Sequence, residues 1–253
     1  MTYYLDTTIQ LSKLFAPVDL RHRIMAQINT YPCTVSRYVR MEYLRWLEPS
    51  IQLHQMLQRE VKRNPTTALD EVQARILMTF GRNQTKMLAI LTLLSRVYGR
   101  EMPLFMLHLE TLIDYEFENL FRKNVTELPD PIACPLMDLH AIRQEASYHL
   151  EPSIPYRRGE MPCHIVEFLQ NHRTELKELA LALNKDYPKM ADACQRVLAN
   201  PDDAQGNLCK TLGDVIIALQ TPAHAVLWTT DASFDLICPA LGISHLRERL
   251  TDY

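Results

Sequence analysis

Two short apolar segments at opposite ends of the chain lead directly into hydroxyl and carboxylate side chains, and this pattern constrains the fold most. Near the amino terminus, Tyr3 to Leu5 precede Asp6, and near the carboxyl terminus, Ala225 to Thr229 precede Thr230 and Asp231. Strands that alternate with helices predict a parallel sheet with helices on its faces. We therefore expect an α/β fold in which both ends share one sheet. Asp6 and Asp231 would then lie just beyond the carboxyl ends of strands, where such sheets bind ligands.

The remainder of both ends predicts further helices and one more strand. Thr7 and Thr8 can cap a helix over residues 9–15. A helix that starts at Ser36, runs through Leu47 and is closed by Pro49 carries Glu42 within its apolar stripe. An unpaired buried acid is costly, so something close to Glu42 must compensate its charge. The other predicted elements are a strand over residues 33–35 and helices over residues 20–28, 208–220, 233–237 and 244–250.

The middle of the chain has a different pattern. Strand signals are missing between residues 50 and 205, and amphipathic patterns predict helices over residues 51–63, 67–80, 85–98, 103–122, 164–184 and 188–198. A proline-rich stretch from Pro129 to Pro162 predicts a looped connector with a short helix over residues 136–148. We therefore predict a discontinuous core, residues 1–49 and 206–253, interrupted by an all-helical insertion over residues 50–205.

Composition favours an ordinary globular protein. The chain has 253 residues, 47% of them hydrophobic, and a net charge of −3, which lacks the excess of bases usual in nucleic-acid-binding proteins. The net charge does not exclude nucleic-acid binding, because acids at a metal site can cancel the charge of basic patches elsewhere. The six cysteines have no zinc-type spacing, the nine histidines form no convincing metal set, and no secretory leader is recognisable. We expect a cytoplasmic protein with reduced thiols and no membrane span.

Four acids stand out as a candidate site: Asp6, Glu42, Asp214 and Asp231. Carboxylates in one pocket repel each other, and a hard divalent cation such as Mg²⁺ or Mn²⁺ relieves that repulsion and activates water. Each acid also has a structural interpretation. Asp6 and Asp214 can cap helices, Asp231 can cap a turn, and Glu42 can pair with Arg45 or with a distant lysine across a helix interface.

Four motifs in this order resemble the PIN-domain family of metal-dependent nucleases. They are Tyr4-Leu5-Asp6-Thr7-Thr8, Val35 to Leu44, Gly213-Asp214-Val215-Ile216-Ile217-Ala218 and Val226 to Phe234. The resemblance covers residues 1–49 and 206–253, and the long middle departs from the compact pattern of the family. The resemblance implies that Asp6, Glu42, Asp214 and Asp231 hold the metal and carry catalysis. Asp235, Thr7, Ser36 and Thr230 are auxiliary candidates, and Ser233 stands where many relatives have Asp.

The function implied is a Mg²⁺- or Mn²⁺-dependent endoribonuclease that hydrolyses RNA phosphodiester bonds with metal-activated water. Toxins of toxin–antitoxin pairs and defence effectors belong to this family. Arg37, Arg40 and Arg45 share a helix with Glu42 and are candidates for contacts with a nucleic-acid backbone. Two alternatives stay open: a structure-specific DNA nuclease, and a non-catalytic PIN-like scaffold whose insertion binds a protein partner or antitoxin.

Overall fold

A parallel sheet of five strands joins the two ends of the chain in this computed structural model, in the order β3-β2-β1-β6-β7. The structure describes residues 1–64, 66–78, 81, 83–98, 101–129, 131–132, 134–153, 164–200 and 208–248. The strands are β1 (Thr2–Leu5), β2 (Cys33–Ser36), β3 (Thr126–Leu128), β6 (Ala225–Thr229) and β7 (His245–Arg247). The predicted α/β class, with helices on a parallel sheet, is confirmed.

The order of the strands creates a switch point between β1 and β6. From β1 the chain passes to β2 on one side, whereas β6, with Trp228 paired to Leu5, lies on the other side. Tyr4, Leu5 and Trp228 are fully buried, which fits strands covered on both faces. Ligand sites of open α/β sheets lie in the crevice outside the carboxyl ends of strands at such a point.

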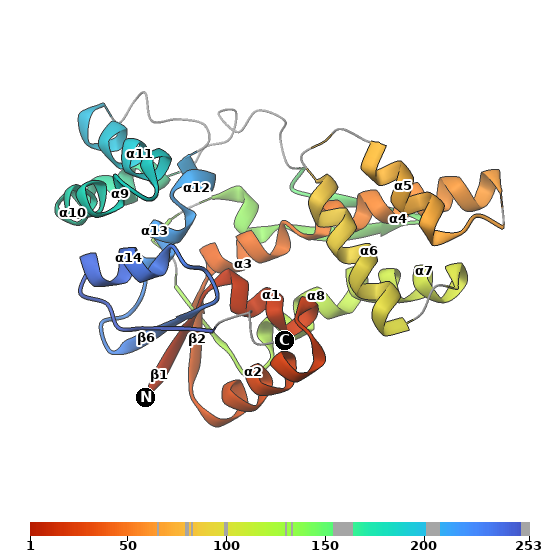
Figure 1. Cartoon of the computed structure of the whole chain (residues 1–253), viewed down its shortest axis with the longest axis horizontal. Helices are drawn as coiled ribbons and strands as arrows, with labels where there is room; N and C mark the ends of the chain where they lie inside the picture. The colour runs from red at the N-terminus through yellow and green to blue at the C-terminus, as the bar shows by residue number, and fades with distance from the viewer. Residues whose placement is uncertain are drawn as a thin grey trace.

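Helices cover both faces of the sheet (Figure 1). On one side lie α1 (Thr7–Phe15) and α2 (Val18–Thr30), and on the other lies α14 (Phe234–Ala240). The segment that follows β2 forms α3 (Arg37–Leu44), and the segment that precedes β6 forms α12 (Leu208–Thr211) and α13 (Gly213–Leu219). The predicted helix over residues 208–220 is thus divided at Leu212.

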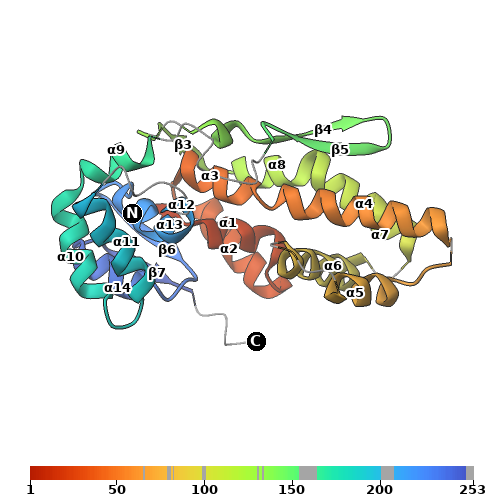
Figure 2. The same cartoon turned by 90° about the horizontal axis from the view of Figure 1, so that it is seen from above.

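The middle of the chain contributes two groups of helices at opposite ends of the molecule (Figure 2). The first group extends away from the sheet and comprises α4 (Leu47–Arg63), α5 (Leu69–Met78), α6 (Gln84–Tyr98), α7 (Met102–Thr111), a π-helical turn (Leu112–Glu116) and α8 (Phe117–Arg122). The second group, α9 (Ile165–Gln170), α10 (Arg173–Leu183) and α11 (Pro188–Ala199), lies beside α14. Part of the proline-rich connector, residues 154–163, lies outside the described residues.

The prediction of an all-helical insertion is wrong in two places. β3 lies within it and pairs with β2, so the core sheet takes one strand from the middle of the chain. Where a short helix was predicted over residues 136–148, the chain forms a 3-10 turn (Pro135–Asp138) and then the hairpin of β4 (His140–Gln144) and β5 (Ser147–Glu151). β3 is three residues long, so its hydrogen bonds to β2, and not its own sequence pattern, define it.

Two predictions near the ends also need correction. The last helix, predicted over residues 244–250, is replaced by β7, which pairs with β6 through Leu246 and Trp228. Pro49 does not close the helix that carries Glu42. That helix ends at Leu44, and Pro49 lies in the first turn of α4, where a helix needs no backbone donor.

Within the described ranges, no helix combines the length and apolar character that crossing a bilayer requires. Cys33, Cys134, Cys194 and Cys238 are free thiols.

Candidate metal centre

The candidate site lies at the carboxyl edge of the sheet, at the switch point between β1 and β6. Asp6 directly follows β1, and Asp231 is the second residue after β6, with Thr230 between them. The backbone N–H of Asp6 donates to the carbonyl oxygen of Trp228 at 3.0 Å, so strand pairing continues up to the acid. Two parts of the chain more than 200 residues apart are thereby fixed side by side.

The Asp6 carboxylate is buried and accepts four hydrogen bonds. It caps α1 by accepting from the backbone of Thr7 at 2.6 Å and of Thr8 at 3.3 Å. The hydroxyl of Thr8 donates to the same group at 2.6 Å, and that of Thr229 donates from β6 at 2.7 Å. The cap of α1 is therefore Asp6 and not Thr7 or Thr8. The interpretation of Asp6 as a helix cap is confirmed.

Glu42 lies against the start of α13. Its Oε2 accepts a hydrogen bond from the Thr7 hydroxyl at 3.0 Å. Its Oε1 is so near Gly213 that a Cβ atom at that position would stand 2.7 Å away, which is closer than real Cβ contacts. Only glycine admits this approach. Glu42 on α3 is thus placed next to the residue that precedes Asp214.

Asp214 and Asp231 are connected through Ser233. The Ser233 hydroxyl donates to Asp214 Oδ2 at 2.7 Å, while the Ser233 backbone N–H donates to Asp231 Oδ1 at 2.9 Å. The N-cap residue of α13 is Leu212, so Asp214 is not the cap that its sequence context allowed. The cap-like interpretation of Asp231 does match its bond to Ser233. Ser233 therefore links two acids from the position where the resemblance led us to expect a further Asp.

Burial raises the pKa values of three of these acids, and repulsion from neighbouring acids adds to the rise for Glu42 and Asp214. Burial raises the pKa of Asp6 above its ordinary value, although hydrogen bonds from Thr8 and Thr229 oppose the rise. Burial, and then the charge of Asp6, raises the pKa of Glu42 to about 7. The same two causes raise the pKa of Asp214 to about 8, with Asp231 and Glu42 adding to the effect. The acids therefore act as one electrostatically coupled group.

No arginine or lysine among the described residues forms an ion pair with Asp6, Glu42, Asp214 or Asp231. In particular, Glu42 does not form the ion pair with Arg45 that its sequence context allowed, although the charge of Arg45 lowers its pKa. Asp235 differs, because it pairs with Arg247 at 2.8 Å and accepts from His245 at 3.1 Å. That auxiliary candidate is already neutralised within the protein.

A lysine from the middle of the chain lies on the Glu42 side of the site. Lys86 on α6 places its ammonium 4.9 Å from the centre of the Trp46 ring, a cation–π contact. Burial, and then the charge of Arg45, lowers the pKa of Lys86 to about 8, and the Lys86 charge in turn lowers the pKa of Glu42. The sequence allowed a distant lysine beside Glu42 but did not identify Lys86, because nothing in the local pattern of α6 connects Lys86 with Glu42.

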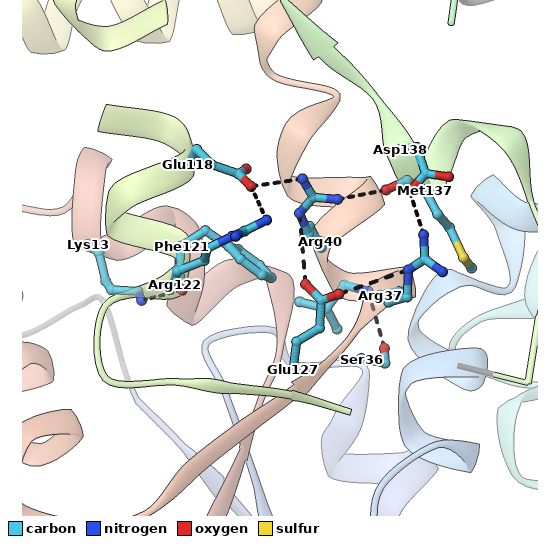
Figure 3. Close-up of polar contacts among 11 residues, drawn as sticks. Lys13, Ser36, Arg37, Arg40, Glu118, Phe121, Arg122, Glu127, Met137 and Asp138 are labelled. Atoms are coloured by element: carbon cyan, nitrogen blue, oxygen red, sulfur yellow. Dashed lines mark hydrogen bonds and ion pairs between the residues drawn. The ribbon is translucent and has the colours of Figure 1, made fainter. Parts of the chain in front are cut away.

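The other two arginine candidates are bound within the protein (Figure 3). Arg40 donates to Glu118 at 2.8 Å and to the carbonyl of Met137 at 2.8 Å, and Arg37 pairs with Asp138. Both lie within 4.0 Å of Glu127, at the edge of β3. These ion pairs hold α3 against α8, β3 and the 3-10 turn. Arg37 and Arg40 therefore have a structural explanation, whereas Arg45 remains the candidate for contact with a phosphate.

The hydroxyl candidates have different surroundings. Thr7 donates to Glu42, as described, and so orients one of the acids. Ser36 is buried and caps α3 by accepting from the backbone of Val39 at 3.3 Å. The backbone of Thr230 donates to the Thr8 hydroxyl at 3.0 Å. Thr8, Thr229 and Ser233, which contact Asp6 or Asp214 directly, were not among the candidates.

The donor chemistry of the site fits a hard divalent cation. Its side chains offer only carboxyl and hydroxyl oxygens, and no arginine or lysine in the described ranges pairs with the acids at contact distance, so a bound cation would compensate the charge that the acids carry when ionised. Those same ranges hold no three His, Cys, Asp or Glu side chains already arranged around one ion. Mg²⁺ commonly takes one or two carboxylates and keeps several waters.

Comparison of the chain with protein-family models, curated proteins and solved structures gives no match. The structure by itself defines an α/β protein with a parallel sheet and an acidic site at its switch point. The likeness to PIN-domain nucleases is an interpretation of the four sequence motifs.

Proposed function

We propose that this protein is a Mg²⁺- or Mn²⁺-dependent nuclease that hydrolyses RNA phosphodiester bonds at the acidic site. The observation that carries the proposal is that Asp6, Glu42 and Asp214 meet at one edge of the sheet, where Thr7 bonds to both Asp6 and Glu42 and Glu42 lies against Gly213, and that no arginine or lysine in the described ranges pairs with them. Such an arrangement destabilises the folded protein, and groups that are kept at this cost cluster at functional sites.

Each of these three acids accepts a hydrogen bond from a hydroxyl group. Thr8 and Thr229 fix Asp6, Thr7 fixes Glu42, and Ser233 fixes Asp214. Side chains held by such bonds lose little freedom on binding a ligand, so the site is pre-organised. A bound divalent ion would supply water activation and neutralise charge on the phosphate. Glu42 and Asp214 would release their protons on binding it, because carboxylate ligands bind metal in the ionised form.

Arg45 and Lys86 would contribute positive charge on the Glu42 side of the site. A phosphodiester carries negative charge that an acidic pocket repels, so nearby bases favour its approach. Lys86 comes from α6, which means that a helix of the middle segment takes part in the site. The choice of RNA over DNA rests on the resemblance to PIN-domain ribonucleases.

The test is cleavage of labelled single-stranded RNA and DNA of the same sequence, with Mn²⁺ and with EDTA. We expect Mn²⁺-dependent cleavage of RNA by the wild type and at least a hundredfold loss in Asp6→Asn. The matched control is Asp192→Asn, which changes an acid on the exposed side of α11 that pairs with Arg196. Preferential cleavage of DNA would favour the alternative that the protein is a DNA nuclease. Absence of cleavage by both Asp6→Asn and the wild type would leave only the scaffold alternative, and equal cleavage by both would refute the role of Asp6.

A further inference from the structure

A cavity of about 320 Å³ lies beside the acidic site, between the α10–α11 turn and α12. It is lined by Asp186, Tyr187, Pro188, Lys189, Met190 and Thr211. Ligand pockets in proteins begin at about this volume, which suits one nucleotide and not a folded segment of a partner. The lining combines an aromatic ring and two apolar side chains with an acid, a base and a hydroxyl.

The cavity adjoins the acids through short connections in the chain. Thr211 ends α12, and Asp214 lies three residues further on, in the first turn of α13. Figure 2 shows α11, α12 and α13 side by side. Burial raises the pKa of the Tyr187 phenol, and the charges of Asp231 and Asp214 add to the rise, so Tyr187 lies within electrostatic range of the acidic site. A ligand in the cavity would therefore lie next to a group bound at the acids.

Tyr187 is held by its backbone and leaves its ring partly exposed. Its N–H donates to the carbonyl of Leu183 at 2.8 Å, and its carbonyl accepts from the N–H groups of Met190 and Ala191 at 3.0 and 3.1 Å. These bonds fix the turn between α10 and α11. A tyrosine on a fixed backbone beside an apolar pocket offers a suitable surface for a nucleobase, because any of the four bases can stack on an aromatic face.

We propose that this cavity binds a nucleobase of single-stranded nucleic acid, stacked on Tyr187, next to the phosphate held at the acidic site. The proposal rests on the proposed function. Asp186 and Lys189 stand at the cavity as partners for the base edge and for an adjacent phosphate. The subsite would position the strand, and it would not take part in bond cleavage.

The test measures binding of AMP, GMP, CMP and UMP to the whole protein in EDTA, by nuclear magnetic resonance titration. The variants are Tyr187→Ala and Tyr187→Leu, which remove the aromatic face, and Tyr187→Phe, which keeps it. Tyr115→Ala is the matched control, because Tyr115 is exposed on the π-helical turn. Circular dichroism verifies that each variant is folded. Loss of one stacked base weakens binding by about 5- to 150-fold in alanine substitutions.

We expect Tyr187→Ala and Tyr187→Leu to weaken nucleotide binding by a factor in that range, and Tyr187→Phe and Tyr115→Ala to bind like the wild type. Equal binding by Tyr187→Leu, or no nucleotide binding by the wild type, would overturn the subsite. Because this assay contains no divalent ion and no cleavage step, its result is independent of whether the protein is a nuclease. If cleavage is observed, Tyr187→Ala should raise KM for RNA with kcat within about threefold, and a lower kcat alone would contradict a positioning role.

Discussion

Replacement of Gly213 by alanine tests the geometry of the site most sharply. The new Cβ would stand 2.7 Å from Glu42 Oε1, whereas ordinary contacts begin at 3.4 Å, so the carboxylate has to move by about 0.7 Å. The atom in the way is the far end of a flexible side chain, and therefore the fold can absorb the change. Catalytic groups must be held within about 0.5 Å, and a 1 Å displacement can cost about a hundredfold in rate.

We expect Gly213→Ala to change the free energy of unfolding by no more than about 1 kcal/mol, because alanine is the better helix former and offsets the strain. The rate of Mn²⁺-dependent RNA cleavage should fall by about 10- to 100-fold. The measurements are thermal unfolding without metal and initial cleavage rates at saturating Mn²⁺. The rise in melting temperature on adding Mn²⁺ provides a second readout that does not depend on turnover.

The matched control is Gly81→Ala, since a Cβ at Gly81 would meet no atom within 4 Å. It should leave both stability and cleavage unchanged. Full activity of a folded Gly213→Ala variant would refute the argument, because it would mean that the position of Glu42 does not matter. Global unfolding of the variant would also refute it, since the contact would then be part of the core.

Three further predictions concern charge. The metal-free protein should lose stability as pH rises from about 4.5 to about 8, because the pKa values of Glu42 and Asp214 are raised to about 7 and about 8. Over this range the folded state holds more protons than the unfolded state. Glu42→Gln should therefore raise the melting temperature at pH 8 and abolish stabilisation by Mn²⁺, and an unchanged melting curve would contradict the coupling. Arg40→Ala should lower the free energy of unfolding by about 2 kcal/mol in urea titrations, because it removes the hydrogen bonds that a mostly buried guanidinium donates to Glu118 and to the carbonyl of Met137, whereas Arg45→Ala should lower it by less than about 0.5 kcal/mol. Lys86→Met keeps the apolar contact with Trp46 and removes the charge, so it should weaken RNA binding. In a plot of the logarithm of the binding constant against the logarithm of the salt concentration, the slope should fall in magnitude by about one. An unchanged slope would exclude contact of Lys86 with a phosphate.

Local sequence was enough to predict the elements that carry the acids. β1 and β6 are apolar segments of four and five residues that end in polar side chains, and such patterns are defined by neighbours in the chain. The helix after Ser36 was predicted from its cap and its apolar stripe. Strand ends in a parallel sheet share one edge, so the placement of Asp6 and Asp231 also followed from sequence alone.

The elements that were missed depend on distant partners. β3 and β7 have three residues each and exist through hydrogen bonds to β2 and β6. A short segment has too few residues to show a period, so its conformation is decided by the strand edge that it meets. The hairpin of β4 and β5 docks Tyr148 against His54 of α4, with ring centres 5.1 Å apart. The sequence of residues 136–151 alone cannot indicate this contact, because His54 lies in another part of the chain.

The sequence by itself determined which acids stand at the ends of strands and that Ser36 begins the helix that carries Glu42, because strand ends and this cap are made by neighbours in the chain. Only the tertiary structure decided which charges are neutralised. Arg40 reaches Glu118, Asp235 reaches Arg247, and Lys86 packs over Trp46. Charge interactions depend on distance in space and on burial, and the folded chain alone sets both of these.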